Sequence, residues 1–392
     1  MESLEGWRLL VLGGMLICGF LAHLSGPLIH VPRVTLLIIV GVVFGPHVLG
    51  LVPDAVTDWF PLVTHIALAI IGFLLGDQFR WRELKHKGVQ VLGISVGESI
   101  AAAGAVFLAV YLLQRDLVLA LVLAGVAPAS APAAIVETVR EGRAKGRLTR
   151  TVLEVVAIDD AWGVIAFSLL LVAATAVGGQ GPATDALWAG LWEVGGGLLL
   201  GVIVGLPMAW ISSRIRGGEL TLIEASGIVI LQTGIATVIG VSYLLAAIAL
   251  GAVVVNLARR KQAFKEIEHV REPLMAIFFI LAGLKLDVNQ LTAIGWIGGA
   301  YIAARAAGLV AGGWLSGVLL GVEAGVRRRV GWCIMPQAGV ALGLALLVQE
   351  RLPAYGQTLL TLVIASTVVF EIAGPLLLRL QLHRSGEWNA AA

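Results

Sequence analysis

The sequence predicts an all-α, polytopic membrane protein with about 13 transmembrane helices. Three observations lead to this fold class. Hydrophobic residues make up 58% of the 392 residues and charged residues only 13%, and the mean hydropathy is +0.94. Apolar runs of about 20 residues, long enough to cross a bilayer as a helix, recur along the whole chain. Lys and Arg gather in every second loop, which is typical of cytoplasmic loops in membrane proteins.

The composition also excludes several classes of protein. A soluble enzyme normally has a charged share of about 25%, which this chain does not approach. The net charge of +2 gives no indication of a nucleic-acid partner. The two cysteines, Cys18 and Cys333, lie in apolar runs. We therefore expect both to be buried small hydrophobic residues rather than parts of a disulfide or a metal site.

The individual spans follow from apolar runs bounded by charged residues or by Gly and Pro. In order, they cover approximately 7–24, 33–51, 60–76, 90–113, 117–139, 150–178, 183–211, 220–239, 242–258, 273–286, 290–320, 328–348 and 357–380. The first run lacks a signal-peptide cleavage site, so it predicts a true span. The long sixth and seventh runs are expected to tilt or to extend past the bilayer. The charged segment 259–272 has a helical pattern and predicts a helix at the cytoplasmic interface.

The positively charged loops set the expected orientation. Lys and Arg cluster at 80–87, 140–150, 214–216, 259–271 and 327–329, and Arg384 follows the last span. These clusters fall after spans 3, 5, 7, 9, 11 and 13, so they all lie on one side of the membrane. The rule that positive loops are cytoplasmic then places the N-terminus outside and the C-terminus inside. The expected location is the cell (inner) membrane.

Two adjacent aspartates, Asp159 and Asp160, lie about ten residues inside the sixth span. An ionisable residue near the bilayer centre costs roughly 2.5–3.5 kcal/mol on insertion scales, so it is a functional candidate. Neighbours on a helix project about 100° apart, so one carboxyl can face a wet cavity while the other faces a partner helix. Burial and mutual repulsion favour protonation of at least one carboxyl. Such a group can exchange a proton for a metal cation. The alternative is a structural polar pair between packed helices.

Two spans carry helix breakers at mid-depth. The fifth contains Pro128, Ser130 and Pro132, and the twelfth contains Pro336, Gln337 and Gly339. Proline removes a backbone donor and clashes with the preceding turn, so both helices are expected to break. Freed carbonyls and the Ser130 hydroxyl could contact a cation. The two spans cross in opposite directions, which predicts inverted repeats with two crossed interrupted helices and a site at the midplane. A simple proline kink is the alternative.

Arg305 lies about fifteen residues into the eleventh span and is too deep to reach water easily. It needs an anionic partner, and Asp159 is the candidate. Alternatively, Arg305 compensates the charge at the end of a broken helix. Four further acids are less central. Glu154, Glu371 and Glu98 are expected to be structural hydrogen-bonding groups, the first two possible accessories to the site, and Glu137 is expected to cap positive loop charge.

These residues together resemble the monovalent cation:proton antiporter superfamily, in particular its bacterial sodium/proton antiporters with an Asp-Asp pair. The matching segments are VPRV at 31–34, GVVFGPH at 41–47, GFLLG at 72–76, FFILAGLKLD at 278–287 and EIAGP at 371–375, together with Ser130 and the Asp159-Asp160 pair. The resemblance implies the antiporter fold, with a core domain at about 60–178 and 290–380. It also implies a scaffold and dimerisation domain at about 1–51 and 183–258, and a homodimer.

By the same resemblance, Asp160 is the principal ion and proton carrier and binds Na⁺. Asp159 would pair with a basic residue on the late unbroken helix. That base is usually Lys in Asp-Asp members, and the eleventh span has no Lys. The lysine position falls on Arg305 or on Leu309, depending on the alignment. Arg does not titrate in proteins, so it cannot release a proton as a lysine can.

The expected function is therefore antiport of Na⁺, or of Li⁺ or K⁺, against H⁺ by alternating access, with no cofactor. The expected partners are a monovalent cation, the proton, the lipid bilayer and a second copy of the chain. A K⁺/H⁺ antiporter, a channel and a sodium-coupled solute symporter are the nearer alternatives. An intramembrane aspartyl enzyme is a more distant one, because its aspartates normally come from two helices.

Overall fold

The computed structural model describes residues 2–29, 33–46, 48–50, 52, 60–178, 188–212, 221–258, 262–286, 295–337 and 339–389. All the regular secondary structure in these ranges is helical, which confirms the predicted all-α class. Seven helices are long and apolar enough to cross a membrane by length and composition, and four shorter apolar helices accompany them. Val31, Pro32, His47 and Asp287 of the sequence motifs lie outside the described residues.

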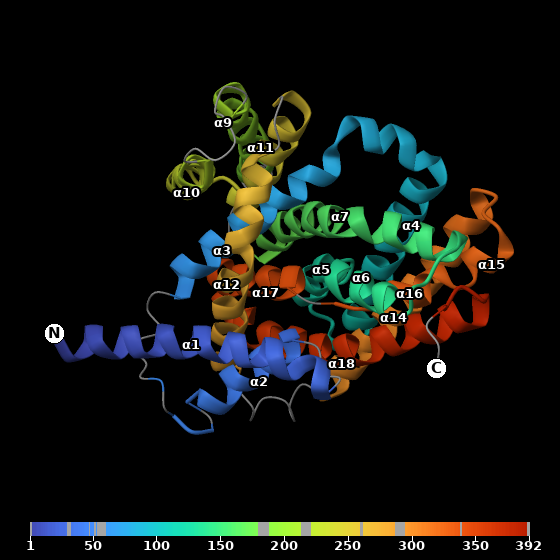
Figure 1. Ribbon diagram of the computed structural model, residues 1–392, viewed down its shortest axis with the longest axis horizontal. Coiled ribbons are helices and arrows are strands. Elements are labelled where there is room, and N and C mark those ends of the chain that lie inside the picture. The colour runs from blue at the N-terminus through green and yellow to red at the C-terminus, as the bar shows by residue number, and fades with distance from the viewer. Residues whose placement is uncertain are drawn as a thin grey trace.

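The helices follow the predicted spans closely (Figure 1). The first half of the chain contains α1 (Glu2–Ile29), α2 (Arg33–Phe44), α3 (Phe60–Leu75), η2 (Gly76–Phe79), α4 (Trp81–Gln114), α5 (Leu117–Val126), α6 (Pro132–Glu141) and α7 (Arg147–Gly178). The second contains η3 (Trp192–Gly196), α9 (Gly197–Ser212), α10 (Thr221–Ile239), α11 (Tyr243–Leu257), α12 (Gln262–Leu284), α14 (Gly295–Leu319), α15 (Ala324–Arg327), α16 (Val330–Cys333), α17 (Gly339–Arg351) and α18 (Pro353–Ser385). The fifth and twelfth spans are the interrupted ones, as predicted.

The charged segment before the tenth span, expected to be helical over 259–272, is helical from Gln262 onward. Its residues form the first turns of α12, which continues through Pro273 without a break. The reason is packing, because Phe264 and Ile267 of this segment are buried. The Phe264 ring stacks on Phe73 of α3, with ring centroids 4.5 Å apart. The apolar face therefore anchors the segment to the helix bundle.

Two close helix crossings relate the halves of the chain. At the first, α2 meets α12, and a Cβ added to Gly41 or Gly283 would lie 2.1 or 2.2 Å from a carbonyl oxygen of the facing helix. At the second, α11 meets the end of α3, and a Cβ on Gly251 or Gly76 would meet facing backbone at 2.1 or 2.5 Å. Only glycine permits such contacts. Thus the second span of each half packs on the third span of the other half: α2 on α12, and α11 on α3. This reciprocal pairing is the pattern of inverted repeats.

The helices form two groups. In the first group, α11 packs against α9, α10 and α3, and α12 packs against α1, α2 and α3. In the second group, α4 packs along α14, α5 along α7 and α17 along α18. In Figure 1, α9, α10 and α11 lie together at the upper left, while α5, α6, α14 and α16 lie to the right of α12. The helix α3, which the sequence placed with the core, makes most of its contacts with the first group.

Candidate functional site

The interruption in the fifth span lies between the end of α5 at Val126 and the start of α6 at Pro132. The intervening residues leave the helical hydrogen-bond ladder because Pro128 has no N–H and Pro132 opens a new helix. The break is fully buried, with Ala127 and Ala129 both 0% exposed. A Cβ on Gly163 of α7 would lie 3.2 Å from the Ala129 Cα. This glycine lets α7 approach the break and brings its aspartates there.

Asp160 faces this break. Its carboxylate accepts a hydrogen bond from the backbone N–H of Ser130. Both side chains are buried, Asp160 at 5% and Ser130 at 3% exposure. Asp160 Oδ1 and Ser130 Oγ have no hydrogen-bond partner among the described residues. Buried polar atoms are almost always satisfied, so two orphaned oxygens on facing residues mark a place for a proton or a cation.

The second interruption runs from the end of α16 at Cys333 to the start of α17 at Gly339. Pro336 packs tightly against α18, where a Cβ on Gly374 would lie 2.6 Å from the proline ring. The Gln337 amide donates to the Val126 carbonyl at 3.3 Å and to the Tyr301 hydroxyl at 3.1 Å. The two interrupted helices therefore meet directly, which the sequence predicted from their breakers.

Arg305 of α14 hydrogen-bonds to the backbone of both interrupted helices where they cross. Its guanidinium donates to the carbonyls of Ala127 and Ala129 at 2.8 and 2.9 Å and to the carbonyl of Met335 at 2.8 Å. The same group lies 4.3 Å from the centroid of the Phe370 ring. These carbonyls stand at the C-terminal ends of α5 and α16, where the helix dipole places negative charge.

Arg305 interacts both with the backbone of the two breaks and with the charge of Asp159. Arg305 is 0% exposed and feels the charges of Asp159 and Glu98, but its hydrogen bonds go to the backbone of both breaks. Of the two roles weighed from the sequence, compensation of a broken-helix end fits this geometry. Leu309, the other candidate for the family lysine position, is buried one turn further along α14.

Asp159 points to a different neighbour, α4. Ser95 donates its hydroxyl proton to Asp159 Oδ1 at 2.5 Å. The buried Glu98 carboxyl also lies beside Asp159, close enough for the two groups to interact. Ser99 donates to Glu98 Oε1 at 3.3 Å. Two carboxyl groups in such contact can hydrogen-bond only if a proton is shared between them. Glu98 is therefore a buried neighbour of Asp159.

Glycines bring α4 and α14 close enough for these groups to meet. A Cβ on Gly308 would lie 2.6 Å from the Ala102 Cα, and one on Gly312 would lie 2.6 Å from the Glu98 Cα. The two helices pack along most of their length. Glu98 and Arg305 consequently lie on facing helices beside the same interruption. The available sequence signal was the recurrence of glycine on α14 at a spacing of four residues after Gly308.

The accessory acids separate into two places. Glu154 lies near the start of α7 and accepts a hydrogen bond from Arg150 at 2.8 Å, with 27% of its side chain exposed. It is therefore part of a surface pair rather than of the aspartate site. Glu371 is 2% exposed on α18, next to the Phe370 that covers Arg305. The charge of Glu137 on α6 acts on it.

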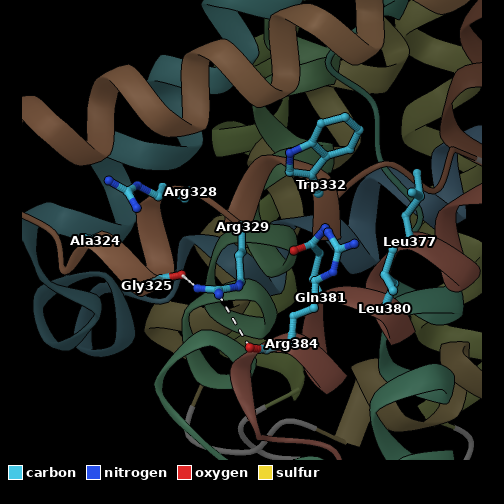
Figure 2. A pocket seen from close by; sticks show the side chains of 9 residues that line it. All are labelled: Ala324, Gly325, Arg328, Arg329, Trp332, Leu377, Leu380, Gln381 and Arg384. Carbon is cyan, nitrogen blue, oxygen red and sulfur yellow. Dashed lines mark hydrogen bonds between the residues drawn. The ribbon is translucent and has the colours of Figure 1, made fainter.

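A cavity of about 490 Å³ lies apart from this site, between α15, α16 and the end of α18 (Figure 2). Its charged lining residues are Arg328, Arg329 and Arg384. A set of cations cannot bind a metal cation. The ion-site candidate is accordingly the closed, narrow arrangement at Asp160 rather than this open pocket.

Comparisons with known proteins agree with the fold. The family model described as "Sodium/hydrogen exchanger, transmembrane" matches residues 12–380. The structure of the sodium proton antiporter MjNhaP1 from Methanocaldococcus jannaschii at pH 8 aligns with a TM-score of 0.71 and 19% identity, covering 99% of this chain and 97% of that one.

A second structure of MjNhaP1, an electron-microscopy map, aligns with a TM-score of 0.69 and 17% identity over 97% of this chain and 98% of that one. No curated protein sequence matches the chain. The structural likeness shows a shared fold, and the family match covers nearly the whole sequence. The chain therefore belongs to the sodium/hydrogen exchanger family, whose members are multi-pass membrane antiporters of cations and protons.

Proposed function

We propose that this protein exchanges Na⁺, or Li⁺ or K⁺, for H⁺ across the cell (inner) membrane by alternating access at Asp160. One observation carries the proposal: Asp160 Oδ1 and Ser130 Oγ are buried and without partners among the described residues, and the two residues are in contact through the Ser130 backbone. A carboxyl group in this position can hold a proton or, once ionised, a cation, but not both. Exchange then follows from competition for one site and needs no chemical reaction.

The residues around Asp160 have separate roles in binding the cation. Arg305 occupies the carbonyls of Ala127 and Ala129, so these oxygens are withdrawn from the cation. The Asp160 carboxylate and the Ser130 hydroxyl remain as the oxygen ligands offered by α7 and the break. Hard monovalent cations prefer such oxygen ligands. The Ser130 N–H orients the carboxylate by donating a hydrogen bond to it.

We propose that the Asp159–Glu98 pair supplies the second transported proton. In Asp-Asp relatives the late helix carries a lysine, which this chain lacks, and Arg305 stays charged throughout. The contact between the two carboxyls supports a shared proton at this point. If that proton leaves when Na⁺ binds at Asp160, two protons move per Na⁺ and the exchange carries charge. Without this pair, exchange would be one for one and electroneutral.

We further propose a division into two moving parts, with the N-terminus outside and the C-terminus in the cytoplasm. The helices α4–α7 and α14–α18 would form the ion-carrying core, and α1–α3 and α9–α12 the scaffold of a homodimer. Two pairs of ionisable side chains join them at one end: His65 with Glu350 at 2.9 Å and Arg351 with Glu193 at 3.5 Å. Movement of the core past the scaffold would break both. The packing of α3 on α11 and α12 supports its place in the scaffold.

The test is ion exchange in proteoliposomes, with an imposed Na⁺, Li⁺ or K⁺ gradient and a pH-sensitive dye inside. Asp160→Asn should abolish cation-driven proton movement, because Asn keeps the shape and removes the titrating charge. The matched control is Glu154→Gln, which neutralises a surface acid on the same helix and should leave exchange unchanged. Substantial exchange by the Asp160→Asn variant would overturn the assignment, and the cation series distinguishes a Na⁺ from a K⁺ exchanger.

The alternative of a sodium-coupled solute symporter predicts a different result in the same vesicles. A symporter would need a co-transported solute and would not acidify or alkalinise the interior when Na⁺ alone is supplied. An intramembrane aspartyl enzyme is excluded by the family, whose members are transporters. The geometry agrees, because Asp159 and Asp160 are adjacent on α7 and face different neighbours.

A further inference from the structure

The cavity of about 490 Å³ at the end of α18 contains three arginines and no acidic residue. It is lined by Ala324, Gly325, Arg328, Arg329, Trp332, Leu377, Leu380, Gln381 and Arg384. Figure 2 shows Arg328 and Arg329 on one side of the cavity and Leu377 and Leu380 on the other. One wall therefore carries two arginines, and the opposite wall, on α18, combines two leucines with Gln381 and Arg384.

Two of the arginines have no partner of their own in the part of the chain that the structure describes. Arg329 is held in place by the Gly325 carbonyl at 2.7 Å and the Arg384 carbonyl at 3.5 Å. Neither the Arg328 nor the Arg384 side chain makes a hydrogen bond or ion pair within the described residues, and both are exposed. Three like charges around one cavity repel one another, and a bound anion would relieve the repulsion.

The apolar part of this wall continues along α18 as a stripe. Ile372, Leu376 and Leu380 follow one another at a spacing of four residues and are 47%, 63% and 42% exposed. The next position in the same series is Arg384. Residues four apart share one face of a helix, so the stripe leads directly to the cationic cavity. From Ile372 to Arg384 the helix rises about 18 Å, which is close to the length of an acyl chain, at 1.5 Å per residue.

We propose that this cavity and stripe bind an anionic phospholipid. The headgroup phosphate would sit between Arg328, Arg329 and Arg384, since guanidinium groups bind phosphate oxygens through paired hydrogen bonds. One acyl chain would lie along Ile372, Leu376 and Leu380. Trp332, which is 37% exposed, lines the cavity where the phosphate region gives way to the chains. Trp is enriched at that level of a bilayer.

The stripe is what favours a lipid over a soluble anion. A free phosphate would need only the arginines and would leave the stripe exposed. The positive-inside pattern places this end of α18 at the cytoplasmic interface, where anionic lipids supply the negative surface charge. The arginines and the stripe thus match the two halves of one amphipathic molecule.

The experiment measures phosphatidylglycerol binding to the purified full-length protein in detergent, by native mass spectrometry and by thermal unfolding. Phosphatidylcholine and inorganic phosphate are the two comparison ligands. The test variant is Arg328→Gln with Arg384→Gln. The matched control is Arg140→Gln with Lys145→Gln, which removes two exposed charges near the same end of the bundle but does not alter the cavity lining.

The wild type and the control should retain phosphatidylglycerol and unfold at a higher temperature in its presence. The test variant should bind it roughly tenfold more weakly, the loss expected for about one charge-assisted hydrogen bond. Equal stabilisation by phosphatidylcholine would overturn the role of charge. Equal stabilisation by inorganic phosphate alone would replace the lipid with a soluble anion. Unchanged binding by the test variant would place the lipid elsewhere on the protein.

Discussion

Replacing Arg305 by Ala tests whether one side chain joins the two interrupted helices. The guanidinium makes three hydrogen bonds, at 2.8, 2.8 and 2.9 Å, to carbonyls of both breaks. A hydrogen bond involving a charged group contributes about 1.5–3 kcal/mol. Three at the lower figure give about 4–5 kcal/mol, which is comparable to the roughly 3–5 kcal/mol cost of removing one member of a buried charged pair. The contributions are not additive, so this is an upper guide.

The assay is thermal unfolding of the purified protein in detergent. For a chain of 392 residues, a loss of this size lowers the apparent Tm by about 5 °C if the unfolding entropy follows the usual per-residue average. Arg305→Lys should recover part of the loss, because an ammonium keeps the charge but cannot reach three carbonyls at once. Arg150→Ala, which removes an exposed arginine from α7, is the control and should change Tm little.

A second substitution distinguishes whether Arg305 stabilises the protein through the carbonyl contacts or by balancing the charge of Asp159. If the carbonyl contacts dominate, adding Asp159→Asn to Arg305→Ala leaves those carbonyls without donors and restores little stability. If instead Arg305 serves mainly to balance Asp159, neutralising the aspartate should restore most of it. Recovery of most of the lost Tm in the double variant would refute the carbonyl-bridging account.

Three further outcomes follow from the packing around the site. Glu98→Gln can still hydrogen-bond to Asp159 but removes the shared proton. The rate of exchange in proteoliposomes should therefore lose its dependence on an imposed voltage, and an unchanged stoichiometry would contradict the proton-sharing role. Gly308→Ala should cost about 1–3 kcal/mol by pushing α14 off α4, whereas Gly299→Ala on the same helix meets nothing within 4 Å and should be tolerated. The Glu387 carboxylate accepts hydrogen bonds from the N–H groups of Leu148 and Thr149 at 2.9 and 2.8 Å and so caps α7. Glu387→Ala should therefore lower Tm, since losing a helix cap costs about 1 kcal/mol. Equal Tm values would show that the cap is dispensable.

The sequence predicted those features that depend on short stretches of chain. Apolar runs located the spans because the bilayer requires about 20 apolar residues at each crossing. Pro128, Pro132 and Pro336 located the breaks because proline disrupts its own turn whatever surrounds it. Asp160 was predicted as a candidate for a similar reason, since a charge in mid-span is costly wherever it points.

The features missed by sequence reasoning depend on how distant segments meet. Asp159 and Glu98 are 61 positions apart, and only the close packing of α4 on α7 and α14 reveals their contact. The hydrogen bonds of Arg305 likewise depend on where two broken helices cross, which the spacing of residues cannot give. The packing of α3 on α11 and α12 likewise depends on contacts between distant segments.

Competition between Na⁺ and H⁺ at Asp160 is the central claim, and proton release on cation binding measures it most directly. Na⁺ is added to the purified protein in weakly buffered detergent solution, and the released protons are recorded with a pH indicator. The wild type should release protons with a saturable dependence on Na⁺, Ser130→Ala should need a higher concentration, and Asp160→Asn should release none from this site. Undiminished proton release from the Asp160→Asn variant would contradict the account.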